Sequence, residues 1–151
     1  MSPEVEHISI ERMSEDDVDE VARLERLCFS DPWSKRSFEE EIKHKFSIPL
    51  VVKSGTKVIG YTCLWYIYDQ LEIANFAISP EFRGKGIGGM MMERVLSEAE
   101  KRGCLTVMLS VRESNETAIN LYTKSGFVEV ERRKNYYRLP TEDAIIMMKN
   151  L

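Results

Sequence analysis

Apolar residues recur along this 151-residue chain with two periods, one typical of strands and one typical of helices. The stretch VEHISIERM alternates apolar and polar residues and therefore predicts a first strand. Apolar residues from Val18 to Cys28 then share one face at helical spacing, and Ser14 is suited to cap that helix. A second, shorter helix is expected after Ser34.

The rest of the chain continues this alternation of strands and helices. We predict a hairpin in IPLVVKSGTKVIGYTCLWYI, a strand in LEIANFAIS, a helix from about Gly88 to Arg102, a central strand in CLTVMLSV, a helix capped by Asn115 and stopped by Gly126, and final strands in FVEVERR and DAIIMMK. The order β-α-α-β-β-β-α-β-α-β-β predicts an α/β (α+β) fold, a mixed sheet flanked by helices. The length suits a single domain over residues 1–151.

Composition and charge narrow the class of protein. A net charge of −4 gives no general attraction to nucleic acid or to an anionic membrane. The chain has no apolar run long enough to span a bilayer and no signal-peptide core. The cysteines Cys28, Cys63 and Cys104 lack metal spacing, and with two histidines no metal site is expected. We therefore expect a cytoplasmic protein with reduced thiols.

The stretch NFAISPEFRGKGIGGMMMERVL places several glycines between a strand and a helix. Such a loop suits phosphate, because the free N–H groups of a helix's first turn face an anion and glycine permits close approach. Arg83 and Lys85 add positive charge there. The Walker pattern is absent, and the dinucleotide fold lacks its second half. A flexible turn without a ligand is the plain alternative.

Arg83-x-x-Gly86-x-Gly88 resembles the [Q/R]-x-x-G-x-[G/A] motif of the GNAT superfamily of N-acetyltransferases. The resemblance covers nearly the whole chain. FSDPWS, SNETAINLYTKSGF and RKNYYRLPTEDAIIMM further resemble the RimI-type protein N-terminal acetyltransferases. This resemblance implies transfer of acetyl from acetyl-CoA, without a metal, to the α-amino group of a protein N-terminus. The substrates of this family include ribosomal proteins.

The resemblance also implies where the cofactor lies. The mostly antiparallel sheet of this family, with its four helices, splays between the fourth and fifth strands, here LEIANFAIS and CLTVMLSV, and pantetheine lies in the gap. The implied cofactor-binding residues are Phe76, Ala77, Ile78, Arg83, Gly84, Lys85, Gly86, Ile87, Gly88, Gly89, Asn115 and Tyr122. For Asn115 a helix N-cap is an equal alternative.

The reaction needs a proton donor for the leaving sulfur and an acceptor for the amine proton. Tyr122 matches the family tyrosine that protonates the sulfur, although a core tyrosine is the plain alternative. The chain departs from the family at LSVR, where Ser110 replaces the usual glutamate. We favour Glu72 as the substitute base. The plain alternative is that Glu72 is an exposed carboxylate at a strand end without a catalytic role. An α-amine, with a pKa of about 7.7–8.0, needs less help from a base than a lysine does.

For the acceptor we predict an aromatic-walled slot that contains Leu27, Trp33 and Tyr137. Phe29 is assigned to packing, and Tyr136 is expected on the opposite face of the strand from Tyr137. Two alternatives stay open: an enzyme for small amines such as polyamines, which would favour an acidic pocket, and a CoA-binding module without catalysis, for which Ser110 is the support. We expect a monomer or weak homodimer.

Overall fold

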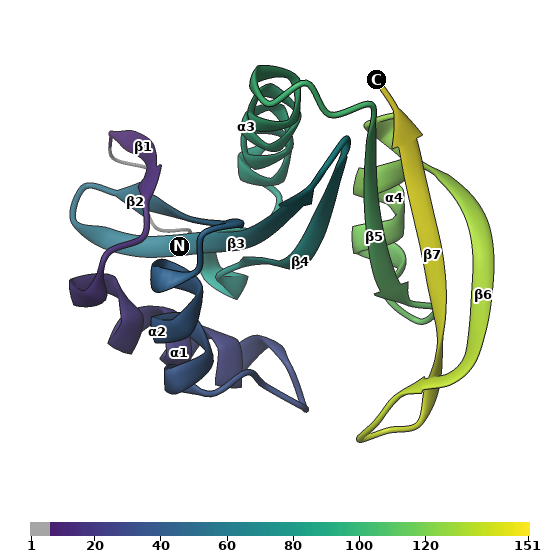
Figure 1. Cartoon of the computed structure of the whole chain (residues 1–151). Helices are drawn as coiled ribbons and strands as arrows, with labels where there is room; N and C mark the ends of the chain where they lie inside the picture. The colour runs from purple at the N-terminus through teal and green to yellow at the C-terminus, as the bar shows by residue number, and fades with distance from the viewer. Residues whose placement is uncertain (1–6) are drawn as a thin grey trace.

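The strands form a seven-stranded sheet in the computed structural model, which describes residues 7–151 (Figure 1). Its order is β1-β2-β3-β4-β5-β7-β6, and the neighbours are antiparallel except for the parallel pair β4 and β5. The bounds are β1 Ile8–Arg12, β2 Ser47–Ser54, β3 Lys57–Ile67, β4 Gln70–Ile78, β5 Thr106–Arg112, β6 Val128–Tyr137 and β7 Glu142–Asn150. The predicted mixed, mostly antiparallel sheet is confirmed.

Four α-helices accompany the sheet in the described part of the chain, in the predicted order. They are α1 Val18–Cys28, α2 Lys35–Lys43, α3 Ile87–Lys101 and α4 Glu116–Lys124, with short 3-10 turns η1 Glu15–Asp17 and η2 Pro80–Phe82. Two of the predicted caps are present, since Ser34 Oγ accepts from Ser37 N at 3.2 Å and Asn115 Oδ1 accepts from Ala118 N at 3.2 Å. Such caps satisfy N–H groups that the helix itself leaves unbonded. Ser14 instead precedes η1, where its N–H and Oγ donate to Asp17 Oδ2, and the N-cap of α1 is Asp17.

The helices cover the two faces of the sheet unequally. Residues of α1 and α2, such as Leu24 and Phe38, pack with Tyr61 of β3 on one face. Residues of α3 and α4 pack with β4 and β5 on the other face. In β5 buried and half-buried positions alternate, although the sequence predicted a uniformly apolar central strand. The cause is that α1 and α2 lie over the β2–β4 half and leave one face of β5 without a helix (Figure 1).

An extra residue in β4 changes which way its side chains point. Cys63 lies opposite Asn75, but Leu64 lies opposite Ile73, so Ala74 forms a bulge. Ile73 packs with the α3–α4 face, whereas Ala77, four residues later, packs with the α1–α2 face. In a regular strand these two side chains would share a face. The bulge therefore places Glu72 and Asn75 on the same side of the sheet.

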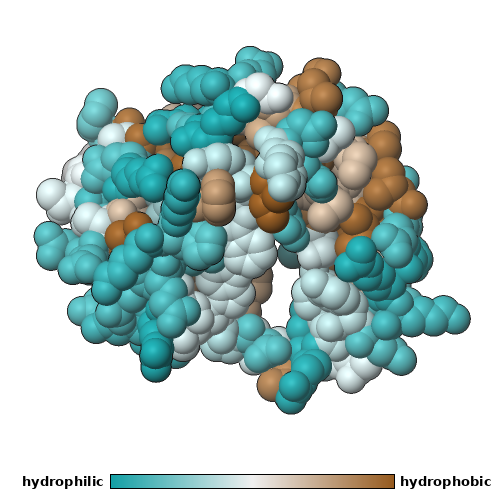
Figure 2. All heavy atoms as spheres, viewed as in Figure 1, coloured by the Kyte–Doolittle hydropathy of each residue, from teal (hydrophilic) through white to brown (hydrophobic). Residues whose placement is uncertain are grey.

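The sheet divides between β4 and β5, as the resemblance implied. Their pairing runs only from Gln70↔Thr106 to Ile73↔Leu109, and the remainder of each strand diverges from the other (Figure 1). The space-filling view shows the molecule hollowed between its two halves below this point (Figure 2). We call this opening the split. Among residues 7–151, no helix is both long and apolar enough to cross a membrane.

Candidate active site

The glycine-rich loop ends at the split and leads into α3. Gly84 and Gly86 have φ values of 75° and 81°, in the left-handed region that glycine adopts without strain. Met90 N donates to Gly86 O at 3.2 Å, so the N–H groups of residues 87–89 precede the first intrahelical bond. A Cβ built at Gly84, Gly86 or Gly89 meets no atom within 4 Å. This open cradle of N–H donors fits a diphosphate.

Gly88 belongs to the same motif but has a different environment. A Cβ at this position would lie 3.1 Å from Leu121 Cδ2 of α4 and 3.2 Å from Ile78 Cδ1 of β4. Its lack of a side chain thus allows α3 to pack closely against both elements, and only its N–H faces the cradle. Two of the three Met90–Met92 side chains, those of Met91 and Met92, are buried beneath the loop.

Arg83 lies folded back towards β4 and the end of α1. Its Nε donates to Ile78 O at 3.2 Å, and Nη2 lies 3.7 Å from Cys28 Sγ. Burial raises the pKa of the Cys28 thiol, and the Arg83 charge opposes this shift only in part. The guanidinium therefore connects the loop, β4 and α1.

The edge of β4 that borders the split offers backbone groups from alternate residues. Ser79 N donates to Ile59 O, and Thr62 Oγ1 donates to Asn75 O, so the odd-numbered residues face β3. Phe76 and Ile78 consequently direct their N–H and C=O groups away from β3, towards the split, and Ile78 O accepts from Arg83 Nε there. Ala77, which was predicted with them, lies opposite Tyr61 and directs its groups towards β3.

Tyr122 lies on α4 beside the split. Its ring contacts Phe76 of β4 edge-to-face at 5.9 Å between centroids and Phe127 at 6.0 Å. Burial raises the pKa of the Tyr122 phenol, and the neighbouring Tyr137 adds to the shift. The hydroxyl is therefore protonated across the physiological pH range and is a proton donor.

Ser110, at the position where the resemblance implies a glutamate, lies on the helix-free face of β5. Burial raises the pKa of the Tyr137 phenol, and a side-chain hydrogen bond from Ser110 to Tyr137 partly offsets that rise. The position is therefore occupied by a hydroxyl next to another hydroxyl, and neither group is a base at neutral pH. The missing carboxylate is not replaced at this point of β5.

Arg112, two residues further along β5, holds the turn between β6 and β7. It donates to the carbonyl oxygens of Arg138 and Pro140 at 2.6 and 2.9 Å and to Glu142 Oε1 at 3.1 Å. Its guanidinium also lies 4.7 Å from the centre of the Tyr137 ring, a cation–π contact. The sequence did not single out Arg112, because its partners lie about 30 residues away in the chain and meet it only in the fold.

The prediction that Tyr136 and Tyr137 lie on opposite faces is wrong. Their rings are in edge-to-face contact with centroids 5.0 Å apart. The strand rule fails here because the β6–β7 register is irregular between Arg133 and Tyr137, and Asn135 has a φ of 53°. Tyr137 is half-buried and Tyr136 is exposed, so the two form one aromatic corner.

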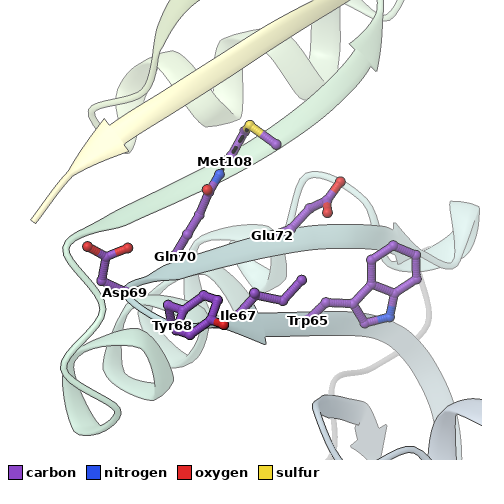
Figure 3. A pocket seen from close by; sticks show the side chains of 7 residues that line it. All are labelled: Trp65, Ile67, Tyr68, Asp69, Gln70, Glu72 and Met108. Atoms are coloured by element: carbon purple, nitrogen blue, oxygen red, sulfur yellow. Dashed lines mark hydrogen bonds between the residues drawn. The ribbon is translucent and has the colours of Figure 1, made fainter.

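Glu72 lines a pocket of about 240 Å³ on the helix-free side of the paired part of β4 and β5 (Figure 3). The lining residues are Trp65, Ile67, Tyr68, Asp69, Gln70, Glu72 and Met108. Burial raises the pKa of Glu72, and the charge of Arg133 opposes the shift. Because Glu72 is half-buried, its carboxylate binds a proton more readily than that of an ordinary glutamate. Sequence analysis missed Trp65 and Met108. The strand register places Trp65 of β3 on one side of Glu72 and Met108 of β5 on the other.

The predicted acceptor residues come from different elements: Trp33 lies in the loop between α1 and α2, Leu27 in the last turn of α1, and Tyr137 at the end of β6. Trp33 packs on the α1–α2 core, stacks on Trp65 at 6.2 Å with 13° between the planes, and so joins the loop to the pocket. Trp65 Nε1 in turn donates to both carboxylate oxygens of the buried Glu41 at 2.8 and 3.0 Å. Phe29 packs on the same core, as predicted. Leu27 is 62 % exposed and points to solvent.

Comparison with known proteins identifies the family to which the chain belongs. The sequence model of the acetyltransferase (GNAT) family matches residues 18–127. The [ribosomal protein bS18]-alanine N-acetyltransferase of Salmonella typhimurium is 33 % identical over 143 residues, which cover 92 % of this chain and 95 % of that protein. The Escherichia coli K12 protein of the same name is 32 % identical over 143 residues, with the same coverage. The crystal structure of the E. coli ribosomal-protein-S18-alanine N-acetyltransferase superimposes with a TM-score of 0.88 at 29 % identity over 95 % of this chain and 94 % of that one.

A sheet that opens between β4 and β5, with a glycine-rich loop before α3, is the arrangement expected of a CoA-dependent acyltransferase. The chain belongs to the GNAT family of acetyltransferases and is an acetyl-CoA-dependent N-acetyltransferase. The alternative that the chain is a CoA-binding module without catalysis is therefore rejected. In the described residues no three side chains of the His, Cys, Asp and Glu types gather into a metal site.

Proposed function

We propose that this enzyme acetylates the α-amino group of a protein N-terminus, with an N-terminal alanine of a bS18-type ribosomal protein as its target. The observation that carries the proposal is that the sheet opens between β4 and β5, with Tyr122 packed on Phe76 at the edge of the opening and Glu72 on the paired part of β4. The names of the relatives, which act on the alanine of bS18, support the substrate.

The residues at the split fit acetyl-CoA. The amides after Gly86 and the charges of Arg83 and Lys85 would hold the diphosphate, and the edge of β4 at Phe76 and Ile78 would pair with the pantetheine amides. When bound, acetyl-CoA supplies an acetyl group activated as a thioester. The Asn115 side-chain oxygen serves as the N-cap of α4, which leaves the Nδ2 group as the part of the side chain for a cofactor contact.

Tyr122 and Glu72 are proposed for the two proton transfers. Glu72 takes the proton of the α-amine, either directly or through water, and its raised pKa makes it a better acceptor than an ordinary carboxylate. The amine nitrogen would bond to the acetyl carbon, and Tyr122 would give its proton to the sulfur as the C–S bond breaks. Trp33, Trp65 and Tyr137 would border the path of the peptide, with Leu27 at the outer rim.

Replacing Glu72 by Gln should change the pH dependence of the reaction. The carboxylate accepts a proton only when ionised, so wild-type kcat/KM rises as the pH increases through the raised pKa of Glu72. The variant depends on the free amine alone, whose pKa is about 7.7–8.0, so its activity should fall on the order of 100-fold at neutral pH and keep rising above pH 8.

The measurement is kcat/KM between pH 6 and 9.5. Asp69→Asn removes another carboxylate from the same pocket and should leave the position of the rising limb unchanged. A Glu72→Gln profile that superimposes on the wild-type profile would rule out Glu72 as the base.

A small-amine acetyltransferase is the second candidate, and one observation favours it. The pocket beside Glu72 also contains Asp69, so two carboxylates lie where a polyamine cation would be attracted. The aromatic walls of the same site and the names of the relatives favour the peptide.

The deciding experiment measures release of free CoA thiol from acetyl-CoA with three acceptors. They are a tetrapeptide that begins with alanine, the same peptide already acetylated at its N-terminus, and spermidine. We expect turnover with the first alone. Turnover with spermidine but not with the free peptide would instead establish the small-amine function.

We further propose that the enzyme works in the cytoplasm as a monomer or weak homodimer, without nucleic acid or membrane.

A further inference from the structure

A buried carboxylate lies at the centre of the molecule, outside the roles described so far. Glu25 of α1 is 2 % exposed. None of the ion pairs formed within residues 7–151 includes it. Burying a charge without a counter-ion is costly, and an apolar side chain of similar size would pack α1 at less cost. The position therefore calls for an explanation beyond packing.

The partners of Glu25 come from different elements of the site. Its Oε2 accepts at 3.0 Å from the backbone N–H of Trp33, in the loop of residues 29–34 between α1 and α2, which we call the acceptor loop. Its Oε1 accepts from the Tyr61 hydroxyl of β3 at 2.8 Å and from Asn75 Nδ2 of β4 at 2.9 Å. One carboxylate thus joins the acceptor loop to β4.

The two ends of this connection lie at the two binding sites. Trp33 stacks on Trp65, which lines the pocket with Glu72. Asn75 directly follows the bulge and precedes Phe76, whose backbone groups face the split. A ligand that pairs with this edge of β4 restrains the segment that carries Asn75. Because Asn75 and Trp33 bond to opposite oxygens of a single rigid group, restraint of one is transmitted to the other.

We infer that Glu25 is a positioning residue that couples occupation of the split by CoA to ordering of the acceptor loop, so that CoA increases the affinity for the peptide. The inference rests on the proposed function, since it takes a peptide N-terminus as the second ligand. Coupling of this kind between two sites is reciprocal and typically changes affinity 5- to 150-fold.

The test measures the Kd of an alanine tetrapeptide by calorimetry with and without saturating CoA, which allows no turnover. In the wild type CoA should lower the peptide Kd by about tenfold. Glu25→Gln keeps the size of the side chain but replaces one acceptor oxygen with a donor, so either Trp33 or Asn75 loses its partner. The coupling factor should then fall to about one, with the Kd of CoA alone unchanged and the peptide KM raised more than kcat is lowered.

Two further variants separate coupling from general stability. Tyr61→Phe removes the third donor but leaves the connection between Trp33 and Asn75, so its coupling factor should match the wild type. Asn75→Ala cuts the connection from the β4 side and should abolish coupling as Glu25→Gln does, with no further loss in the double variant. It also keeps the test available if Glu25→Gln fails to fold.

Two results would overturn the inference: a wild type without coupling, or Glu25→Gln and Asn75→Ala proteins that retain it. Retention would mean that the two ligands contact each other directly. A wild type that binds CoA but neither binds nor acetylates the peptide would refute the proposed function itself, which is a different outcome.

Discussion

Tyr122→Phe should lower kcat by about 100-fold or more while changing the Kd of acetyl-CoA less than about twofold. The substitution removes one hydroxyl and keeps the ring that packs between Phe76 and Phe127, so the wall of the split stays intact. What is lost is the proton for the leaving sulfur. Steady-state thiol release gives kcat, and calorimetry gives the affinity for CoA.

The raised pKa of Tyr122 adds a pH criterion to this prediction. A phenol donates only while it is protonated, so loss of activity through its ionisation begins only at a pH above its ordinary pKa of about 10. The wild-type kcat should therefore show no falling limb up to about pH 9.5. Tyr137→Phe removes the neighbouring hydroxyl and should act on the peptide KM more than on kcat. Equal losses of kcat and CoA affinity in Tyr122→Phe would show that the residue only packs.

Gly86→Val should abolish measurable binding of acetyl-CoA, a loss of at least about 100-fold in affinity, or roughly 2.7 kcal/mol. No protein atom lies within 4 Å of the added Cβ, so a steric effect of the side chain must come from the ligand. The φ of 81° also strains any other residue, by about 1–2 kcal/mol. Calorimetric titration with CoA measures the loss.

Gly103→Val is the matched control for this strain. Gly103 has a φ of 70°, lies beyond the other end of α3 and likewise has no atom within 4 Å of an added Cβ. Both variants should lose similar thermal stability, but Gly103→Val should bind CoA as the wild type does. Equal affinity of the two variants for CoA would show that the loop around Gly86 does not hold the diphosphate.

Local chemistry explains why the order of elements was predictable. Helices start where Ser34 and Asn115 cap them, and α3 is followed by Gly103 with its positive φ, so these boundaries depend on residues close in sequence. The glycine motif with Arg83 was predictable for the same reason, since a phosphate loop is made from consecutive backbone amides. Tyr122 and Glu72 came from resemblance to a family, because periodicity does not distinguish a catalytic side chain from a packing one.

Other features depend on residues that meet only in the fold. The bulge at Ala74 turns Glu72 and Asn75 to one face, and the irregular backbone before Tyr137 brings both tyrosines of the corner together. Glu25 looks in the sequence like one more charge on a helix. It is buried because Trp33, Tyr61 and Asn75 converge on it from three other segments.

By itself the sequence determined the helices, the strands, the cofactor loop and the class of enzyme, because each depends on short-range spacing or on a contiguous motif. The tertiary structure alone decided which strands are neighbours, where the sheet opens and which side chains share the reaction centre. Those properties arise from the register between strands that lie far apart in the chain, and a shift of one residue reverses the face that every side chain occupies.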